Sequence, residues 1–256
     1  MIRSYFRYLF SAGNEHSLHS PFVFELYTRT IRPRSTTPDP AFAGIEAIRT
    51  KMKNSSEEIE VLDFGAGSRK GNTPRKKIST IAKNAQKPSK FARLLYRLIR
   101  RFEPKTLFDL GTSLGLTTLY ESHAAPHAQI TSFEGCPETA RVAQENLSGR
   151  NNVQIVVGNL DETLTAALAR TERLDFAFFD ANHRYEPTLR YFEACLTRAH
   201  DESVFVFDDI HWSEEMEKAW TDIQAHPRVA VTIDLFFVGL VFFRQKQPRQ
   251  HFVLRF

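Results

Sequence analysis

The chain has 256 residues, of which 42% are hydrophobic, 12% aromatic and 25% charged. This composition provides enough apolar mass for a sizeable core and excludes a wholly disordered or fibrous chain. The longest apolar stretch, Leu235 to Phe243, falls well short of the roughly 20 residues that a membrane-spanning helix needs. Arg3 and Arg7 interrupt the apolar N-terminus, which argues against a signal peptide. Cys136 and Cys195 form no CxxC pair, so we expect no disulfide framework or zinc ribbon and favour the cytosol.

The net charge of +4 hides a strong asymmetry along the chain. Residues 1–102 carry 20 Lys and Arg against 8 Asp and Glu, whereas residues 103–256 carry 14 against 22. A basic segment can bind nucleic acid, an anionic membrane surface or an acidic substrate, or it can complement the acidic part by packing against it. We therefore expect a basic, mainly helical N-terminal extension over 1–102 and a separate domain over 103–256.

The extension contains three helical patterns in chain order. Ser20 is a good N-cap residue, and Pro21 suits the first helical position. The expected helices cover residues 22–32, 41–52 and 89–102, the last with apolar residues at amphipathic spacing.

One glycine-rich stretch in the extension imitates a nucleotide-binding loop. It runs from Asp63 to Lys77, but it lacks the Gly-Lys-Ser/Thr sequence of a phosphate loop and the spaced acid of a dinucleotide site. We interpret residues 63–77 as a lid loop, whose Arg69 and Lys70 would meet an anionic acceptor.

From Lys105 onward, short apolar runs alternate with helical segments. This alternation predicts right-handed βαβ crossovers and a parallel sheet that is covered on both faces. The expected strands are 106–110, 129–133, 153–157, 174–179 and 203–207, and the expected helices are 114–122, 137–147, 160–169, 185–198 and 213–225. The last two runs, 228–234 and 238–244, leave no room for a crossover helix between them, so this pair must be antiparallel.

A glycine turn follows the first of these strands. Gly111 and Gly115 would let the backbone turn tightly and approach a ligand, and the helix that follows offers free N–H groups. Glu134 closes the second strand, at the spacing where a carboxylate binds ribose hydroxyls.

With these residues in place, the chain resembles the class I S-adenosylmethionine-dependent methyltransferases, and in particular their catechol and caffeoyl-CoA O-methyltransferase-like small-molecule branch. The likeness covers residues 104 to about 244. It implies an α/β, Rossmann-like class I methyltransferase sheet, mostly parallel with an antiparallel C-terminal strand. It also implies that S-adenosylmethionine is held by Asp109, Gly111, Thr112, Ser113, Gly115, Glu134, Asn159, Asp161 and Asp180. A helix cap is the alternative role for Asp161.

A second cluster is acidic. Asp180, Asp208 and Asp209 follow the fourth and fifth strands, at the edge where open α/β sheets bind ligands. In the metal-dependent branch that the chain resembles, these positions hold a divalent cation such as Mg²⁺, which accepts oxygen ligands. This sequence departs from that branch, because its final pair is Asp-Asp rather than Asp-Asn and because His183 replaces a lysine. Helix capping by Asp208 and Asp209 is the alternative.

His183 is the candidate catalytic base, with Asp180 beside it, because a histidine can accept the acceptor's hydroxyl proton near neutral pH. His211 and Trp212 follow the fifth strand, either as walls of an acceptor pocket or as edge packing.

The leading hypothesis is thus O-methylation of a small-molecule acceptor in the cytoplasm. An RNA methyltransferase that uses the basic extension is an alternative within catalysis, although the dispersed basic residues argue against nucleic acid. A non-catalytic membrane-surface or scaffold module is the alternative outside catalysis, because the aromatic N-terminus beside Arg3 and Arg7 suits an interfacial helix. Weak peripheral membrane contact and a homodimer both stay open.

Overall fold

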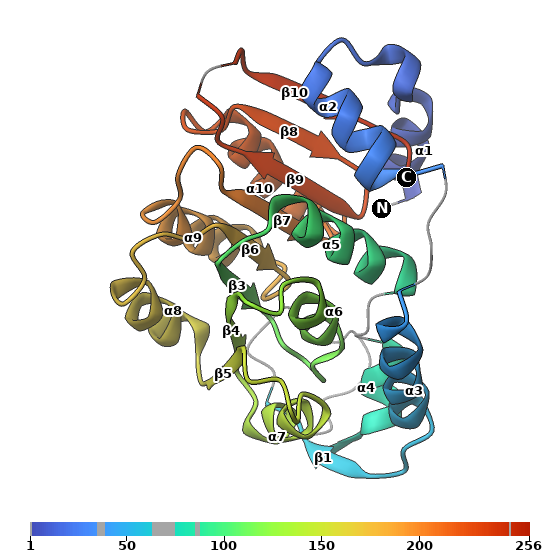
Figure 1. Cartoon of the computed structure of the whole chain (residues 1–256), viewed down its shortest axis with the longest axis vertical. Coiled ribbons are helices and arrows are strands. Elements are labelled where there is room, and N and C mark those ends of the chain that lie inside the picture. Colours follow the sequence, from blue (N-terminus) through green and yellow to red (C-terminus); the bar gives the residue numbers. More distant parts are fainter. Residues whose placement is uncertain (1, 35–38, 63–74, 85–87, 246) are drawn as a thin grey trace. The chain divides into compact units, whose positions relative to one another are not determined.

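The computed structural model describes residues 2–34, 39–62, 75–84, 88–245 and 247–256 (Figure 1). The chain divides into two compact units, one made of residues 1–34 and 165–256 and the other of residues 35–164. Each unit therefore takes residues from both sides of the boundary that we expected after residue 102, and that boundary stays a prediction. Most of the expected lid, residues 63–74, lies outside the described residues.

The unit of residues 35–164 contains a parallel three-stranded group with the order β3-β4-β5. Its register pairs Leu110 of β3 with Phe133 of β4, and Glu134 of β4 with Val157 of β5. A small antiparallel pair, β1 and β2, had not been expected. The elements are α3 (Ala41–Lys53), β1 (Glu58–Glu60), β2 (Arg75–Lys77), α4 (Ile78–Asn84), α5 (Ser89–Phe102), β3 (Thr106–Leu110), α6 (Leu116–Ala124), β4 (Gln129–Glu134), α7 (Pro137–Asn146) and β5 (Val153–Val157).

The elements of this unit begin where local chemistry favours them. Pro137 occupies the first turn of α7, where a missing N–H costs nothing. Gly115 precedes α6 with φ of 80°, in the left-handed region that a side chain disfavours. A Cβ added at Gly115 would lie 3.2 Å from Leu147 and 3.3 Å from Ala143. Glycine at this position therefore allows both the turn and the close packing of α6 on α7.

The other unit contains five strands in the order β10-β8-β9-β7-β6. Strands β6 and β7 are parallel, whereas β9 pairs antiparallel with both β7 and β8, which confirms the expected terminal hairpin. The edge strand β10, parallel to β8, had not been expected. The elements are α1 (Ile2–Ser11), a 3₁₀ turn (Glu15–Ser17), α2 (Pro21–Leu26), a π-helical turn (Tyr27–Ile31), α8 (Leu160–Ala169, from the junction onward), β6 (Phe176–Phe179), α9 (Tyr185–Leu196), β7 (Val204–Asp208), α10 (Glu214–Ala225), β8 (Val231–Asp234), β9 (Val238–Phe242) and β10 (Gln250–Val253).

Aromatic side chains fill the core of this unit. All residues of β6, β7 and β9 are buried, as expected for strands with apolar cover on both faces. Phe179 and Phe207 stack with ring centroids 4.2 Å apart, and Phe192 meets Phe207 in an edge-to-face contact. This packing fixes the ends of β6 and β7, from which the acidic residues follow.

The expected helix start at Ser20 and Pro21 is confirmed, since the Ser20 hydroxyl accepts a hydrogen bond from the Val23 N–H. Within the described parts of the chain, no helix has the length and apolar character needed to cross a bilayer.

Candidate functional site

The turn between β3 and α6, residues 111–115, has a backbone conformation suited to binding a ligand, and we call it the cofactor cradle. Gly111 has φ of 125°, a value that a residue with a Cβ rarely adopts, and Ser113 has φ of 49°. The N–H groups of Gly111 and Thr112 both donate to the carbonyl of Phe133, at 3.2 and 2.9 Å. These bonds fix the turn against the end of β4 and leave its outer edge to a ligand.

Asp109 stabilises this turn through a network of hydrogen bonds between side chains. Its side chain is fully buried, and its Oδ2 accepts hydrogen bonds from the hydroxyls of Thr118 and Ser132, each at 2.7 Å. The Thr112 hydroxyl lies 2.6 Å from that of Ser132 and joins the same network. Direct contact of Asp109 and Thr112 with a cofactor stays a prediction, and the hydroxyl network shows how both residues hold the turn in shape.

Glu134 lies at the end of β4, beside the turn. Its Oε2 accepts the Ser113 N–H at 2.8 Å and its Oε1 accepts the Cys136 N–H at 2.9 Å. Burial disfavours the carboxylate more than these two bonds favour it, and the pKa of Glu134 rises from its ordinary 4.5 to about 7. A ligand that donates hydroxyl groups to this carboxylate would relieve the cost of its burial.

Asn159 and Asp161 lie at the start of α8. The carbonyl of Asn159 accepts the N–H groups of Glu162 and Thr163, and its side-chain Oδ1 accepts the Asp161 N–H at 3.1 Å. Asn159 is thus the capping residue, whereas Asp161 is exposed in the first helical turn, where its charge suits the helix dipole. The helix-capping role, which was the alternative for Asp161, is therefore performed by Asn159. Adenine contacts by Asn159 and Asp161 stay a prediction.

These features fit the nucleoside and amino-acid parts of S-adenosylmethionine. The cradle has a backbone conformation at Gly111 that residues with a Cβ rarely adopt, and Glu134 is a partly buried carboxylate suited to hydroxyl donors. We infer that Gly111, Ser113 and Glu134 are the direct contacts on this unit.

The acidic cluster lies in the other unit, after β6 and β7. His183 Nε2 is 3.4 Å from Asp180 Oδ1, 3.7 Å from Asp208 Oδ2 and 3.9 Å from Asp209 Oδ2. Asp208 is buried, with 2% of its side chain exposed, whereas His183 and Asp180 are partly accessible. The structure therefore brings together the four residues after these two strands that the sequence singled out for metal binding or catalysis.

Two residues of these loops have left-handed backbones without being glycine. Asn182 has φ of 55° and Asp209 has φ of 53°. The Asp209 N–H donates to the carbonyl of Phe237 at 2.6 Å, and the Asn182 side chain donates to the Tyr191 hydroxyl at 3.3 Å. Such conformations cost about 1 kcal/mol or more each and persist where surrounding contacts impose them, often at functional sites.

The donor atoms of this cluster fit a divalent cation. One ligand atom each from Asp180, His183 and Asp208 lie within 4.8 Å of one another. His183 Nε2 is buried and has no hydrogen-bond partner among the described residues, so it is available as a ligand. This group of possible ligands differs from the expected group of three aspartates, because it contains His183 instead of Asp209. A combination of carboxylate oxygens with one imidazole nitrogen suits Mg²⁺ less well than Mn²⁺ or Zn²⁺.

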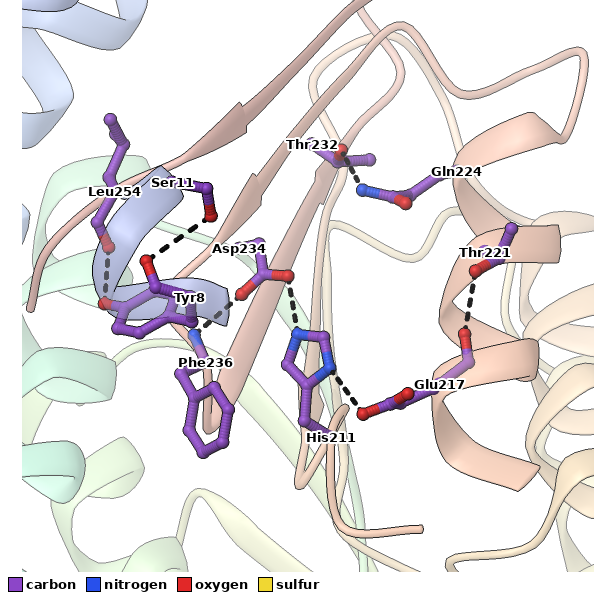
Figure 2. Close-up of polar contacts among 10 residues, drawn as sticks. All are labelled: Tyr8, Ser11, His211, Glu217, Thr221, Gln224, Thr232, Asp234, Phe236 and Leu254. Atoms are coloured by element: carbon purple, nitrogen blue, oxygen red, sulfur yellow. Dashed lines mark hydrogen bonds and ion pairs between the residues drawn. The ribbon is translucent and has the colours of Figure 1, made fainter. Parts of the chain in front are cut away.

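A second histidine cluster had not been foreseen as such. His211 Nε2 donates to Asp234 Oδ2 at 2.7 Å, and its Nδ1 lies 3.4 Å from Glu217 Oε1 (Figure 2). Burial opposes the charged ring, but the hydrogen bond and charge of Asp234, with a smaller contribution from Glu217, raise the pKa of His211. The ring stacks on Phe236 with centroids 5.1 Å apart. His211 therefore links the loop after β7 to the β8–β9 turn, and no local sequence pattern pairs residues 211 and 234.

Comparison with known proteins decides the class of the fold. Residues 108–210 match the family described as a methyltransferase domain. The matched range contains every residue that we singled out for cofactor, metal or catalysis, from Asp109 to Asp209.

A curated O-methyltransferase is similar to part of this chain. The O-methyltransferase imqG of Aspergillus flavus is 31% identical over 86 residues, which are 30% of this chain and 35% of that protein. The chain thus spans about a third of the length of this curated relative.

Solved structures confirm the expected Rossmann-like fold. The Podospora anserina methyltransferase PaMTH1, bound to S-adenosylhomocysteine, aligns with a TM-score of 0.59 over 88% of this chain and 97% of its own, at 14% identity. The Bacillus cereus O-methyltransferase in complex with S-adenosylhomocysteine aligns with a TM-score of 0.56 over 86% and 97%, at 15% identity. The O-methyltransferase TomG from Streptomyces achromogenes, in complex with S-adenosylmethionine, aligns with a TM-score of 0.54 over 62% and 82%, at 19% identity.

Proposed function

We propose that this protein is an S-adenosylmethionine-dependent O-methyltransferase of a small-molecule acceptor. The observation that carries the proposal is the cluster of Asp180, His183, Asp208 and Asp209 within a methyltransferase domain. Methyl transfer to a hydroxyl requires that the oxygen be oriented and that it lose its proton, and this cluster contains groups for both tasks.

The cofactor cradle has a binding role in this proposal. S-adenosylmethionine supplies a methyl group bonded to a positively charged sulfur. The acceptor oxygen would bond to this methyl carbon in line with the carbon–sulfur bond, which breaks to release S-adenosylhomocysteine. Gly111 and Ser113 would contact the cofactor through the backbone, and Glu134 would accept hydrogen bonds from ribose hydroxyls. Asp109 and Thr112 would act as positioning residues, because their side chains hold the turn.

The acidic cluster has an orienting role. Asp180, His183 and Asp208 would hold a divalent cation, with Asp209 as an outer carboxylate, and such a cation supplies Lewis acidity to the acceptor's oxygens. Without a cation, His183 is the group that can accept the hydroxyl proton, and the three aspartates would stabilise the imidazolium that forms. An acceptor with two neighbouring oxygens, such as a vicinal diphenol, suits the first arrangement.

Metal removal separates these two roles of His183. The protein is treated with chelator and dialysed, and methyl transfer to a panel of diphenols is measured before and after Mg²⁺ or Mn²⁺ is restored. Loss and recovery of activity support the cation. Full activity in excess chelator assigns His183 as the base, and His183→Ala should then lower the rate of methyl transfer.

A matched pair of variants controls for general charge effects. Asp208→Asn removes a buried carboxylate of the cluster, whereas Asp201→Asn removes an exposed carboxylate after α9. Calorimetric titration with Mn²⁺ should lose its heat signal only in Asp208→Asn. A cytosolic location and a homodimer stay predictions of the sequence.

A further inference from the structure

The N-terminal helix α1 is anchored to its unit along one edge. The Tyr8 hydroxyl donates to the carbonyl of Leu254 at 2.7 Å (Figure 2). The same hydroxyl accepts the Phe256 N–H at 3.2 Å. Tyr8 and Ala12 are buried against Phe236, at the β8–β9 turn. This edge fixes the helix on the β-strands, so that the opposite side of α1 has a defined orientation.

The remaining face of α1 exposes a stripe of large apolar side chains. Phe10 is 90% exposed and Phe6 57%, and both Tyr5 and Leu9 are 40% exposed. Residues 5, 6, 9 and 10 lie on one side of an α-helix, because positions four apart are neighbours on its surface. A contiguous apolar stripe of this kind marks an interaction surface, unlike single exposed apolar residues.

The exposed stripe adjoins further aromatic surface on the same unit. Tyr5 packs edge-to-face on Phe236 with ring centroids 4.9 Å apart, and Phe236 packs edge-to-face with Phe237 at 4.8 Å. Phe237 is itself 39% exposed, whereas Phe236 is buried. Phe236 thus connects the stripe on α1 to a second exposed aromatic side chain at the tip of the β8–β9 hairpin.

The charges of α1 and of the N-terminal segment favour an anionic partner. Arg7 is exposed on α1, and this helix contains no acidic residue. Residues 1–34 contain five arginines against two glutamates. A second copy of the chain would bring like charges together in a self-complementary contact, since an isologous interface pairs each patch with itself.

We propose that the stripe of Tyr5, Phe6, Leu9 and Phe10, with Arg7, docks this protein on an anionic lipid bilayer. The phenyl rings would enter the boundary between headgroups and acyl chains, and Arg7 would stay among the phosphates. The helix lies in the plane of the membrane surface. This inference is independent of the proposed O-methylation, because it uses other residues.

Vesicle sedimentation of the full chain tests the proposal. The probe is phosphatidylcholine vesicles with and without one third phosphatidylserine, at low and high salt. We expect binding to the anionic vesicles that weakens as salt screens the charges. The double variant F6S/F10S should lower the partition coefficient about tenfold or more, because it removes two exposed rings. Phe24→Ser is the matched control, because Phe24 is 46% exposed on α2, outside the stripe.

A second pair of variants tests the charge. Arg7→Glu should weaken binding to the anionic vesicles, and Arg29→Glu, which changes an exposed arginine of the π-helical turn, should affect it much less. Circular dichroism shows whether each variant is folded.

Three outcomes would overturn the proposal. One is the absence of binding to the anionic vesicles, and another is an equal loss in F6S/F10S and Phe24→Ser. The third is a dimer, seen by analytical ultracentrifugation, that dissociates in F6S/F10S, which would assign the stripe to a second copy of the chain.

Discussion

We expect the partly buried carboxylate of Glu134 to make cofactor affinity depend on pH. Its pKa in the ligand-free protein is about 7, because burial outweighs the two backbone hydrogen bonds that it accepts. In the proposed site, ribose hydroxyls would donate best to the ionised form, so cofactor binding would favour loss of the proton. The ionised fraction falls from about nine-tenths at about pH 8 to about one-tenth at about pH 6. We therefore expect the affinity for S-adenosylhomocysteine to fall up to about tenfold over this interval.

Calorimetric titration measures both the affinity and the proton release. At about pH 6, in buffers of different ionisation enthalpy, the binding of S-adenosylhomocysteine should release close to one proton. Glu134→Gln should bind more weakly at every pH and lose the dependence. Asp161→Asn is the matched control, because it neutralises an exposed acid on the same unit and should keep the dependence. A flat affinity in the unmodified protein, or an unchanged slope in Glu134→Gln, would refute the reasoning.

The same shift has a consequence for stability with a defined sign. An acid with a raised pKa in the folded state binds its proton more tightly there than in the unfolded chain. Its contribution to stability is thus fully present below the ordinary pKa of 4.5 and is lost as the pH rises through about 7. Glu134 alone should therefore lower the free energy of unfolding of the ligand-free protein by up to about 3 kcal/mol as the pH rises from 4.5 to about 7.

Three further predictions follow from single contacts. Gly115→Val should destabilise the protein by about 2 kcal/mol or more in urea unfolding, because φ of 80° and the nearby Leu147 and Ala143 exclude a branched side chain. An unchanged unfolding midpoint would contradict this prediction. Tyr8→Phe should cost about 1 kcal/mol in the same assay, because it removes the hydrogen bond to Leu254; a stabilised protein would show that this bond is not formed. Asp209→Ala should raise the Mg²⁺ or Mn²⁺ concentration for half-maximal methyl transfer, and an unchanged requirement would remove Asp209 from the site.

The sequence predicts the parallel strands well because each is a continuous buried apolar run between turn residues. The expected strands 106–110 and 153–157 match β3 and β5, and the helix expected at 89–102 matches α5. Glycine and acid positions likewise predict the cradle and the cluster, since these residues directly follow strands whose ends must converge. Local pattern and topology are enough for these features.

Features that depend on distant partners were not predictable. Strand β2 consists of Arg75, Lys76 and Lys77, which is a poor strand sequence in isolation. It pairs antiparallel with β1, and the register places Arg75 opposite Glu60 and Lys77 opposite Glu58. Strand β10 is short and lies at the edge, where only its pairing with β8 defines it. The partners of Asp109 at Thr118 and Ser132 arise from the packing of α6 on the sheet, which a residue pattern does not specify.

The most direct test of the central claim is methyl transfer itself. The purified full chain is incubated with methyl-labelled S-adenosylmethionine, a panel of vicinal diphenols and Mg²⁺ or Mn²⁺, and labelled product is identified by mass spectrometry. We predict a product that gains one methyl group on oxygen, with much less formed by Asp208→Asn than by Asp201→Asn. Cofactor binding without labelled product from any hydroxyl acceptor, or equal product from both variants, would contradict the account.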